Sequence, residues 1–251
     1  MNCCEVIKMV IIGFIFIMVL LCIVAELLEH CEKKRKGFES YYNKLIKRAF
    51  DILISGVALL VLWPVYFIIA IAIVVEDGFP ILYRAERGGY NNKSFEISKF
   101  RSMVKNADKI GGGTTALHDP RITKIGNLLR KTKLDELPQL GQVFLGKMSL
   151  IGPRPELVRY TEQYQEEELN ILKVRPGITD YSSIEFINLD EIVGSNNADE
   201  MYEKYVLKKK NALRVKYANT VSFHVDMSIL FKTLGAVFKK AYGYIFKHEH
   251  R

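Results

Sequence analysis

Two long runs of residues without a charged side chain constrain this chain more than any other feature. The first extends from Met9 to Ala25 and the second from Ile52 to Val75. As α-helices they would be roughly 25 Å and roughly 36 Å long, because each helical residue adds about 1.5 Å. The hydrocarbon core of a bilayer is about 30 Å thick. Both runs therefore predict helices that lie in a membrane.

We interpret the first run as an N-terminal transmembrane helix that is not cleaved. A cleaved signal peptide is the alternative interpretation. The residues ahead of Ala25-Glu-Leu-Leu28 lack the small side chains of a cleavage site, which favours the anchor.

The second run contains Pro64 at its middle. A proline inside a helix removes a backbone hydrogen bond and clashes with the preceding turn, so a kink is expected there. Lysine and arginine near a membrane favour its cytoplasmic side. Only Lys8 precedes the first run, whereas many basic residues flank the second: Lys33, Lys34, Arg35, Lys36, Lys44, Lys47, Arg48, Arg84, Arg87 and Lys93. Both ends of the second run are thus expected to be cytoplasmic, which predicts a re-entrant, Pro-kinked hairpin; a full span is the alternative.

The remainder of the chain predicts an α/β domain that is mainly α-helical. Pro80–Tyr83 and Phe95–Phe100 alternate in polarity and favour β structure, so we expect them to form a small sheet around a turn at Gly88–Asn92. Gly111–Gly113 matches no phosphate-loop motif and is interpreted as an ordinary loop. Apolar residues from Met227 to Ile245 recur at helical spacing and predict an amphipathic helix, either interfacial or packed on the domain.

These features divide the chain into three expected parts. Residues 1–43 would form the membrane anchor and a basic linker, and residues 44–78 the re-entrant hairpin. Residues 79–251 would form a cytoplasmic catalytic domain. Cys3, Cys4, Cys22 and Cys31 all precede that domain, which excludes a thiol nucleophile in it.

An adjacent acidic pair, Asp135 and Glu136, is the candidate reaction centre. An isolated pair of this kind usually lies on a solvated helix face. Here the neighbouring sequence is rich in cations, namely Arg130, Lys131, Lys133 and Arg154. A carboxylate among cations ionises readily and can approach a phosphate or hold a divalent cation against it. Thr132 and Asp135 match a helix-capping pattern, so Asp135 is expected near a helix N-terminus.

Six motifs occur in a fixed order along the chain: Lys47-Arg-Ala-Phe-Asp51, Lys99-Phe-Arg-Ser-Met103, Asp119-Pro-Arg-Ile-Thr123, Leu134-Asp-Glu-Leu-Pro-Gln139, Met148-Ser-Leu-Ile-Gly-Pro-Arg-Pro155 and Val174-Arg-Pro-Gly-Ile-Thr179. Together they resemble the bacterial sugar transferase family, within the monotopic polyprenyl-phosphate phosphoglycosyl transferase superfamily. The resemblance covers roughly residues 44 to 240.

The resemblance implies a reaction and roles for individual residues. A sugar-1-phosphate would pass from a UDP-sugar to polyprenyl (undecaprenyl) phosphate with release of UMP, as the first step in making a cell-surface glycoconjugate such as capsule, exopolysaccharide, O-antigen or a glycoprotein glycan. Asp135 would attack the β-phosphate to form a covalent phosphosugar-enzyme, and Glu136 would bind Mg²⁺. Arg154 is expected to clamp a phosphate, because arginine can bind phosphate through two hydrogen bonds. Further candidates for diphosphate or uridine contacts are Lys99, Arg101, Arg121 and Arg175.

The implied partners are the UDP-sugar, the polyprenyl phosphate and membrane lipid, at the bacterial inner membrane with the catalytic domain in the cytoplasm. The formal net charge is +8, but no nucleic-acid motif is present, so the basic tract Lys208–Lys216 is interpreted as facing anionic headgroups. The donor sugar, the pathway and a homo-oligomeric state are left open.

Two other functions also stay open. One is a membrane-bound, Mg²⁺-dependent phosphohydrolase or diphosphatase that passes the group to water, and the other is an inactive membrane scaffold. The chain departs from many members of the family at Asp180-Tyr-Ser-Ser183, where they have Gly-Trp/Leu-Ala-Gln. This departure is expected to alter contacts with the sugar or nucleotide rather than the phosphoryl chemistry.

Overall fold

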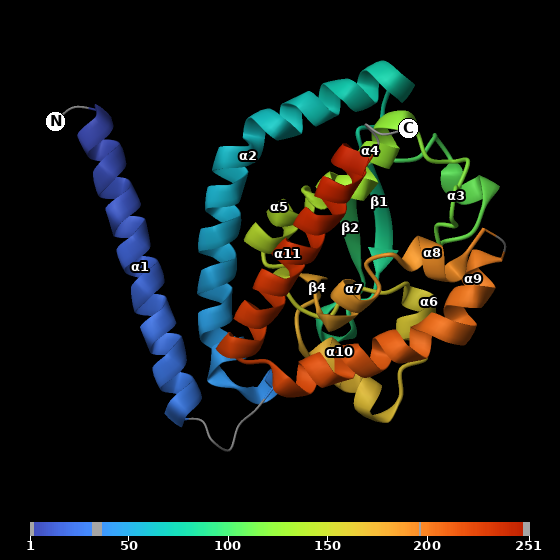
Figure 1. The fold of residues 1–251 in the computed structure, drawn as a ribbon. Helices are drawn as coiled ribbons and strands as arrows, with labels where there is room; N and C mark the ends of the chain where they lie inside the picture. Colours follow the sequence, from blue (N-terminus) through green and yellow to red (C-terminus); the bar gives the residue numbers. More distant parts are fainter. Residues whose placement is uncertain (1–2, 32–36, 196, 248–251) are drawn as a thin grey trace.

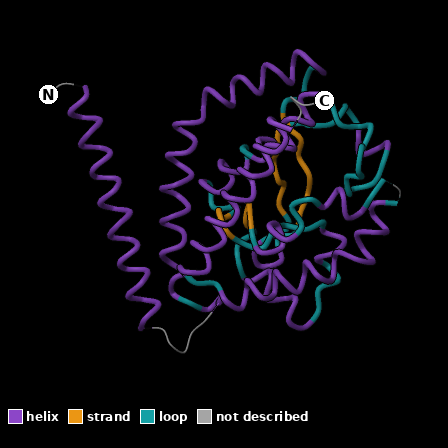
Figure 2. The backbone as a smooth tube through the Cα atoms, viewed as in Figure 1, coloured by secondary structure: helices purple, strands orange, loops and turns teal. Residues whose placement is uncertain are grey.

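The computed structural model describes residues 3–31, 37–195 and 197–247. It is mainly helical, with two small two-stranded sheets (Figures 1 and 2). The longer helices are α1 (Cys3–Cys31), α2 (Lys47–Asp77), α4 (Lys124–Thr132), α10 (Lys208–Thr220) and α11 (Phe223–Lys247). The shorter ones are α3 (Ala107–Ile110), α5 (Gln139–Phe144), α6 (Val158–Thr161), α7 (Tyr181–Glu185), α8 (Leu189–Val193) and α9 (Ala198–Met201).

Helix α1 contains the predicted transmembrane segment. It is long and apolar enough to cross a membrane, and Figure 1 shows most of it standing apart from the other elements. Near its C-terminal end Ala25 is buried, and a Glu29 oxygen accepts a hydrogen bond from the Phe223 backbone N–H at 3.1 Å. The anchor is therefore fastened to the start of α11, while its outer apolar surface is available to lipid.

Helix α2 contains the predicted hairpin and is one continuous helix with Pro64 inside it. Figure 1 shows a sharp bend near its middle, where the proline lies. Its outer face is apolar and open: the Trp63 side chain is 66% exposed, and Leu60 and Phe67 are also exposed. The sequence predicted this kink, and its cause is the missing N–H and the ring clash of proline.

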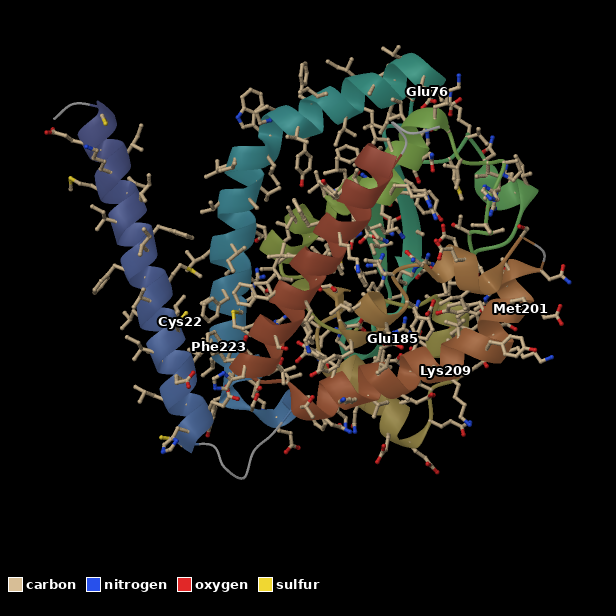
Figure 3. All side chains as sticks on the ribbon, viewed as in Figure 1. Cys22, Glu76, Glu185, Met201, Lys209 and Phe223 are labelled. Carbon is tan, nitrogen blue, oxygen red and sulfur yellow. The ribbon has the colours of Figure 1, made fainter. Side chains whose placement is uncertain are left out.

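Both ends of α2 are attached to the same globular body. At the start, Arg48 donates to the carbonyls of Val143 and Phe144, at 2.6 and 2.8 Å, which satisfies the last carbonyls of α5. At the far end, labelled in Figure 3, Glu76 accepts hydrogen bonds from the first N–H groups of α4, the nearest at 2.7 Å. The geometry is that of a re-entrant segment, and its placement in a membrane stays a prediction.

The first and last residues of the motif Lys47-Arg-Ala-Phe-Asp51 join α2 to the core. Lys47 forms a buried ion pair with Asp226 of α11. Asp51 accepts hydrogen bonds from the Leu150 N–H at 2.9 Å and the Ser149 hydroxyl at 3.1 Å. A buried polar or charged group is costly without partners; Lys47 has its ion pair, and Asp51 has its two hydrogen bonds.

The two sheets differ in type. Strand β1 (Leu82–Arg87) pairs antiparallel with β2 (Phe95–Phe100), and β3 (Ser149–Ile151) pairs parallel with β4 (Gly177–Thr179). The sequence predicted β2 with its observed bounds, but placed the preceding strand at Pro80–Tyr83. That boundary was wrong: Pro80 has no N–H to donate to a partner strand, and the alternating pattern continues to Arg87.

Helices α10 and α11 test the predictions for the basic tract and for the amphipathic C-terminal helix. Helix α11 packs on the domain through the fully buried Ile229, yet keeps an apolar outer face on which Phe238 is 73% exposed. The packed alternative is confirmed for the inner face, and an interfacial position of the outer face stays a prediction. The basic tract on α10 was wrongly assigned to lipid headgroups as a whole, because Lys210 and Arg214 are buried inside the domain.

Candidate active site

A cavity of about 880 Å³ opens among β2, α4, α7, α10 and α11. Four of the residues predicted for the site line it: Asp135, Glu136, Lys99 and Arg154. The structure therefore brings the acidic pair together with a lysine and an arginine from distant parts of the chain.

The acidic pair lies in a 3-10 turn, Leu134–Glu136, between α4 and α5. The predicted helix cap is wrong: Thr132 is the last residue of α4, and its hydroxyl donates to the Leu128 carbonyl at 2.8 Å. Lys133 then turns the chain with a left-handed φ of 63°. The turn places both carboxyl side chains inward, with Asp135 4% and Glu136 8% exposed.

Arg154 is positioned by the close packing of two glycine motifs. Gly152 donates to the Thr179 carbonyl at 2.9 Å, and Gly177 donates to the Pro153 carbonyl at 3.0 Å. A Cβ atom on Gly177 would lie 2.1 Å from the Gly152 nitrogen, so neither motif tolerates a side chain at its glycine. This packing explains why the two motifs, far apart in sequence, form one wall of the cavity.

Glu136 is held by two cations. The Arg154 Nη1 donates to Oε2 at 3.0 Å, its Nη2 donates to Oε1, and the Lys99 Nζ donates to Oε1 at 3.0 Å. Burial alone would raise the pKa of Glu136, but Arg154 and Lys99 outweigh it and hold that pKa well below its usual range. Glu136 is therefore ionised and fixed in orientation.

Asp135 is in the opposite situation. Its Oδ1 is buried, and no described residue donates a hydrogen bond to it. Burial raises the pKa of Asp135, while Lys99 and Lys133 pull it back toward the ionised form. A buried oxygen without a donor is an unused acceptor in a cavity, as expected for a group that meets a substrate.

The acidic pair fits a magnesium ion that binds together with a diphosphate. Among residues 3–31, 37–195 and 197–247 there is no cluster of three or more acidic, histidine or cysteine side chains arranged as a complete metal site. Mg²⁺ needs only one or two protein carboxylates when substrate phosphates and water supply the other ligands. The ionised Glu136 is such a carboxylate, since its Oε2 accepts one hydrogen bond, from Arg154, and keeps a free lone pair.

The other three predicted arginines are not among the cavity-lining residues. Arg101 donates to the carbonyls of Asp77 and Gly78 at the end of α2. Arg121 pairs with Asp119, and Arg175 lies 5.2 Å from the ring centre of Tyr90. Here these guanidinium groups support the fold, and their proposed contacts with diphosphate or uridine stay predictions.

Asp180 begins the segment Asp180–Ser183, where the sequence departs from many family members, but the sequence alone did not reveal its role. The side chain is fully buried and accepts hydrogen bonds from the Ser183 N–H at 2.7 Å and the Ser182 hydroxyl at 2.8 Å. It also accepts from the Arg154 N–H at 3.1 Å. Asp180 thus caps α7 and supports the arginine, while both serines line the cavity.

Several basic residues of the cavity were not predicted as site residues. They come from three separate parts of the chain: Arg87, Lys210, Arg214 and Lys240. The basic tract Lys208–Lys216 was the signal for Lys210 and Arg214, and it does not show which of its side chains turn inward.

Comparison with known proteins gives the site its context. The bacterial sugar transferase family matches residues 42–240. The UDP-glucose:undecaprenyl-phosphate glucose-1-phosphate transferase of Escherichia coli (strain K12) is 38% identical over 206 residues, 80% of this chain and 42% of that protein. The undecaprenyl-phosphate glucose phosphotransferase of Komagataeibacter xylinus is 34% identical over 202 residues, 78% of this chain and 36% of that protein.

A relative of similar length also matches. The exopolysaccharide production protein ExoY of Rhizobium meliloti (strain 1021) is 35% identical over 208 residues, 77% of this chain and 85% of that protein. This chain spans less than half the length of the two glucose phosphotransferases. The family match begins just before α2 and ends in α11, so it includes every residue that lines the cavity. The chain therefore belongs to the bacterial sugar transferase family.

Proposed function

We propose that this protein transfers a sugar-1-phosphate from a UDP-sugar to undecaprenyl phosphate, with release of UMP. The observation that carries the proposal is the contrast within the acidic pair. Glu136 accepts hydrogen bonds from Arg154 and Lys99, whereas Asp135 Oδ1 is buried at the same cavity and accepts none from the described part of the chain. Two adjacent carboxylates with different environments can take different roles.

In the first step an Asp135 carboxylate oxygen attacks the β-phosphorus of the UDP-sugar. The new bond joins that oxygen to phosphorus, and the bond between phosphorus and the bridging oxygen breaks, so UMP leaves with the bonding electrons. Aspartyl-phosphate formation is an accepted form of nucleophilic catalysis. Arg154 and Lys99 lie beside the reacting group and can stabilise the charge of the phosphoryl oxygens.

In the second step a phosphate oxygen of undecaprenyl phosphate attacks the same phosphorus. The bond to Asp135 breaks, the free carboxylate returns, and the product is the undecaprenyl-diphosphate sugar. Mg²⁺ bound by Glu136 with the substrate phosphates would neutralise phosphate charge during transfer.

The acceptor side of the cavity faces α11. Lys133 and Lys240 line the cavity there, next to Ala236 and Val237 of α11. The outer face of the same helix carries the exposed Phe238. A lipid with a phosphate head could place its head near the lysines while its chain stays in the apolar layer, which suits a cytoplasmic catalytic domain on an inner membrane.

The names of the relatives describe glucose phosphotransfer and exopolysaccharide production. We infer that this chain acts in the same class of pathway, at the first step of a cell-surface glycoconjugate. Ser182 and Ser183, within the departure at Asp180–Ser183, line the cavity. The donor sugar of this chain is therefore to be found by measurement and not from the names of its relatives.

Mass spectrometry of the intact protein tests the covalent step. After incubation with Mg²⁺ and a panel of UDP-sugars, without acceptor, the expected result is a mass increase equal to one phosphosugar. Asp135→Asn should abolish it, whereas Glu185→Gln, an exposed change on α7, should not. No adduct with any donor, or an adduct that persists in Asp135→Asn, contradicts the proposed role of Asp135.

Acceptor dependence separates transfer from hydrolysis. UMP release should stop after about one turnover without undecaprenyl phosphate and should continue when it is added. Sustained UMP release without acceptor would instead favour the phosphohydrolase. Absence of any UMP release, with intact folding, would favour the inactive scaffold.

A further inference from the structure

A second charged group lines the same cavity, and the phosphoryl steps do not use it. It is built around Glu156, which follows the Gly-Pro-Arg-Pro turn. Three cations from two elements interact with this carboxylate: Arg87 ends β1, and Lys210 and Arg214 lie on α10. Their charges exceed that of the single glutamate by two.

Arg214 already neutralises Glu156. The Arg214 Nη2 donates to Glu156 Oε2 at 3.0 Å, and the Tyr202 hydroxyl donates to the same oxygen. The Leu157 N–H donates to Oε1 at 3.1 Å. Burial raises the pKa of Glu156, but Arg214 and Lys210 outweigh it and lower that pKa to about 2. Both oxygens of Glu156 are therefore engaged without a direct bond to Lys210.

Lys210 is a buried cation without a counterion in direct contact. It is 7% exposed, and its Nζ lies between two rings, 5.1 Å from the centre of Tyr202 and 6.0 Å from that of Phe186. No described residue forms a hydrogen bond or ion pair with it. Burial, and then repulsion by Arg214, lower the pKa of Lys210 to about 7. Burying such a cation is costly unless an anion meets it in the working complex.

Arg87 faces the same part of the cavity. Its guanidinium donates to the neighbouring Glu86 carbonyl at 3.3 Å, which leaves most of its donors for another partner. Burial lowers the pKa of Arg87, and Glu156 partly restores it. Arg87 and Lys210 therefore both line the cavity and both interact with Glu156 and Arg154, and Ser182 and Ser183 line the same cavity.

This second group is separate from the reacting pair but adjacent to it. The charges that act most on Asp135 are Lys99, Glu136 and Lys133. Those that act most on Lys210 are Arg214, Glu156 and Arg154. Arg154 also binds Glu136, so it lies between the two groups. Asp135 and Lys210 line the same cavity, so one ligand in it can meet both groups.

We propose that Lys210 and Arg87 bind a second anionic oxygen group of the nucleotide-sugar donor, across Arg154 from the phosphate that Asp135 attacks. The inference rests on the proposed function for the identity of the donor. Two parts of a donor carry such a group: the α-phosphate that leaves with UMP, and the carboxylate of an acidic sugar. Both would supply the missing negative charge.

Calorimetric binding by the full chain in detergent tests the inference with three probes: UMP, UDP-glucose and UDP-glucuronate. The test variant is Lys210→Met, which keeps the length of the side chain and removes its charge. Lys209→Met is the matched control, because Lys209 is the preceding residue on α10, is exposed, and is labelled in Figure 3. Lys210→Arg should retain binding, which separates the need for a cation from a requirement of the fold.

If the group is the α-phosphate, Lys210→Met should weaken all three probes by about tenfold or more, as expected for loss of a hydrogen bond to a charged group. If the bound group is a sugar carboxylate, Lys210→Met should weaken the binding of UDP-glucuronate only. The inference is overturned if Lys210→Met binds all three probes as tightly as Lys209→Met does. It is also overturned if only the binding of UDP-glucose weakens, or if the wild-type protein binds none of the probes.

These results can be read apart from the proposed function, because binding of UMP needs neither turnover nor acceptor. A phosphosugar adduct with unchanged binding by Lys210→Met would keep the function and remove the inference. If Lys210→Met loses UMP binding and the wild type forms no adduct, the inference stands and the proposed function falls.

Discussion

Arg154 binds both carboxylate oxygens of Glu136: its Nη1 donates to Oε2 at 3.0 Å and its Nη2 donates to Oε1. This paired contact makes the two adjacent acids chemically different. Glu136 is fixed and ionised, while Asp135 keeps an unpaired oxygen at the cavity. The same arginine is held from behind by the Ile178 carbonyl at 2.7 Å and by Asp180.

Replacing Arg154 should reduce transfer strongly. Arg154→Met removes a positioned donor to the phosphoryl group, so we expect kcat to fall by about 10²- to 10³-fold. Arg154→Lys should recover little of it, because lysine cannot bind two oxygens in one plane. UMP release in the presence of acceptor measures both. Thermal unfolding should be followed alongside, since breaking a buried pair can cost about 3–5 kcal/mol; Arg159→Lys, at a more exposed arginine, is the control.

Binding of the donor should weaken as the pH rises. The pKa of Lys210 is lowered to about 7, so in the free protein its charge is present below pH 7 and is lost above it. An anionic ligand prefers the charged form, so affinity for UMP should fall between about pH 7 and pH 9. Calorimetric measurement of UMP affinity from pH 7 to pH 9, in the wild type and in Lys210→Arg, checks this prediction. The arginine variant should show a flatter profile, and parallel profiles would contradict the assignment.

Asp180 should couple helix α7 to catalysis. Asp180→Ala removes the acceptor for Ser183 N–H and for Arg154 N–H, so stability should fall by about 0.5–2 kcal/mol, the range for loss of a helix cap. The kcat should also fall, because the Arg154 backbone loses a contact. Chemical denaturation and UMP release measure the two effects. Glu185→Gln on the same helix should change neither, and an Asp180→Ala protein with full kcat would show that the capped turn does not position Arg154.

The lysines near α11 should act mainly on the KM for the acceptor, although Lys133 also favours the ionised form of Asp135. Lys133→Met and Lys240→Met should each raise the KM for undecaprenyl phosphate by roughly fivefold, since one lysine near an anionic lipid headgroup contributes about 1 kcal/mol. Steady-state kinetics with each substrate varied in turn measures this. Lys239→Met, an exposed neighbour, is the control. A larger change in the KM for UDP-sugar than for the acceptor would place these lysines in the donor subsite.

Cysteine labelling should show both ends of α2 on one side of the membrane. The measurement uses Lys44→Cys and Lys93→Cys in a background in which the native cysteines are serine; both lysines are exposed. A maleimide that cannot cross the membrane should label neither cysteine in intact cells. It should label both once the cells are lysed or the vesicles are inverted, so that the cytoplasmic face is accessible. Labelling of Lys44→Cys and Lys93→Cys from opposite faces would mean that α2 spans the bilayer and that the bend at Pro64 is only a kink.

The sequence by itself determined the local features of this protein. Runs without charge specified two long apolar helices that could cross a membrane, because a helix in lipid must satisfy its own backbone and cannot carry unpaired charges. Pro64 specifies a bend by its own covalent structure. The acidic pair and its basic surroundings indicated phosphoryl chemistry, because those groups are adjacent along the chain.

Only the tertiary structure decided which cations meet which carboxylates. Arg154 reaches Glu136 because the backbones of Gly152 and Gly177 pack in contact, and no pattern within either motif encodes that approach. Lys209 and Lys210 look alike in the sequence, yet one is exposed and the other is buried beside Tyr202. Successive helical residues point about 100° apart, so the orientation of α10 against the domain separates a surface lysine from a binding lysine.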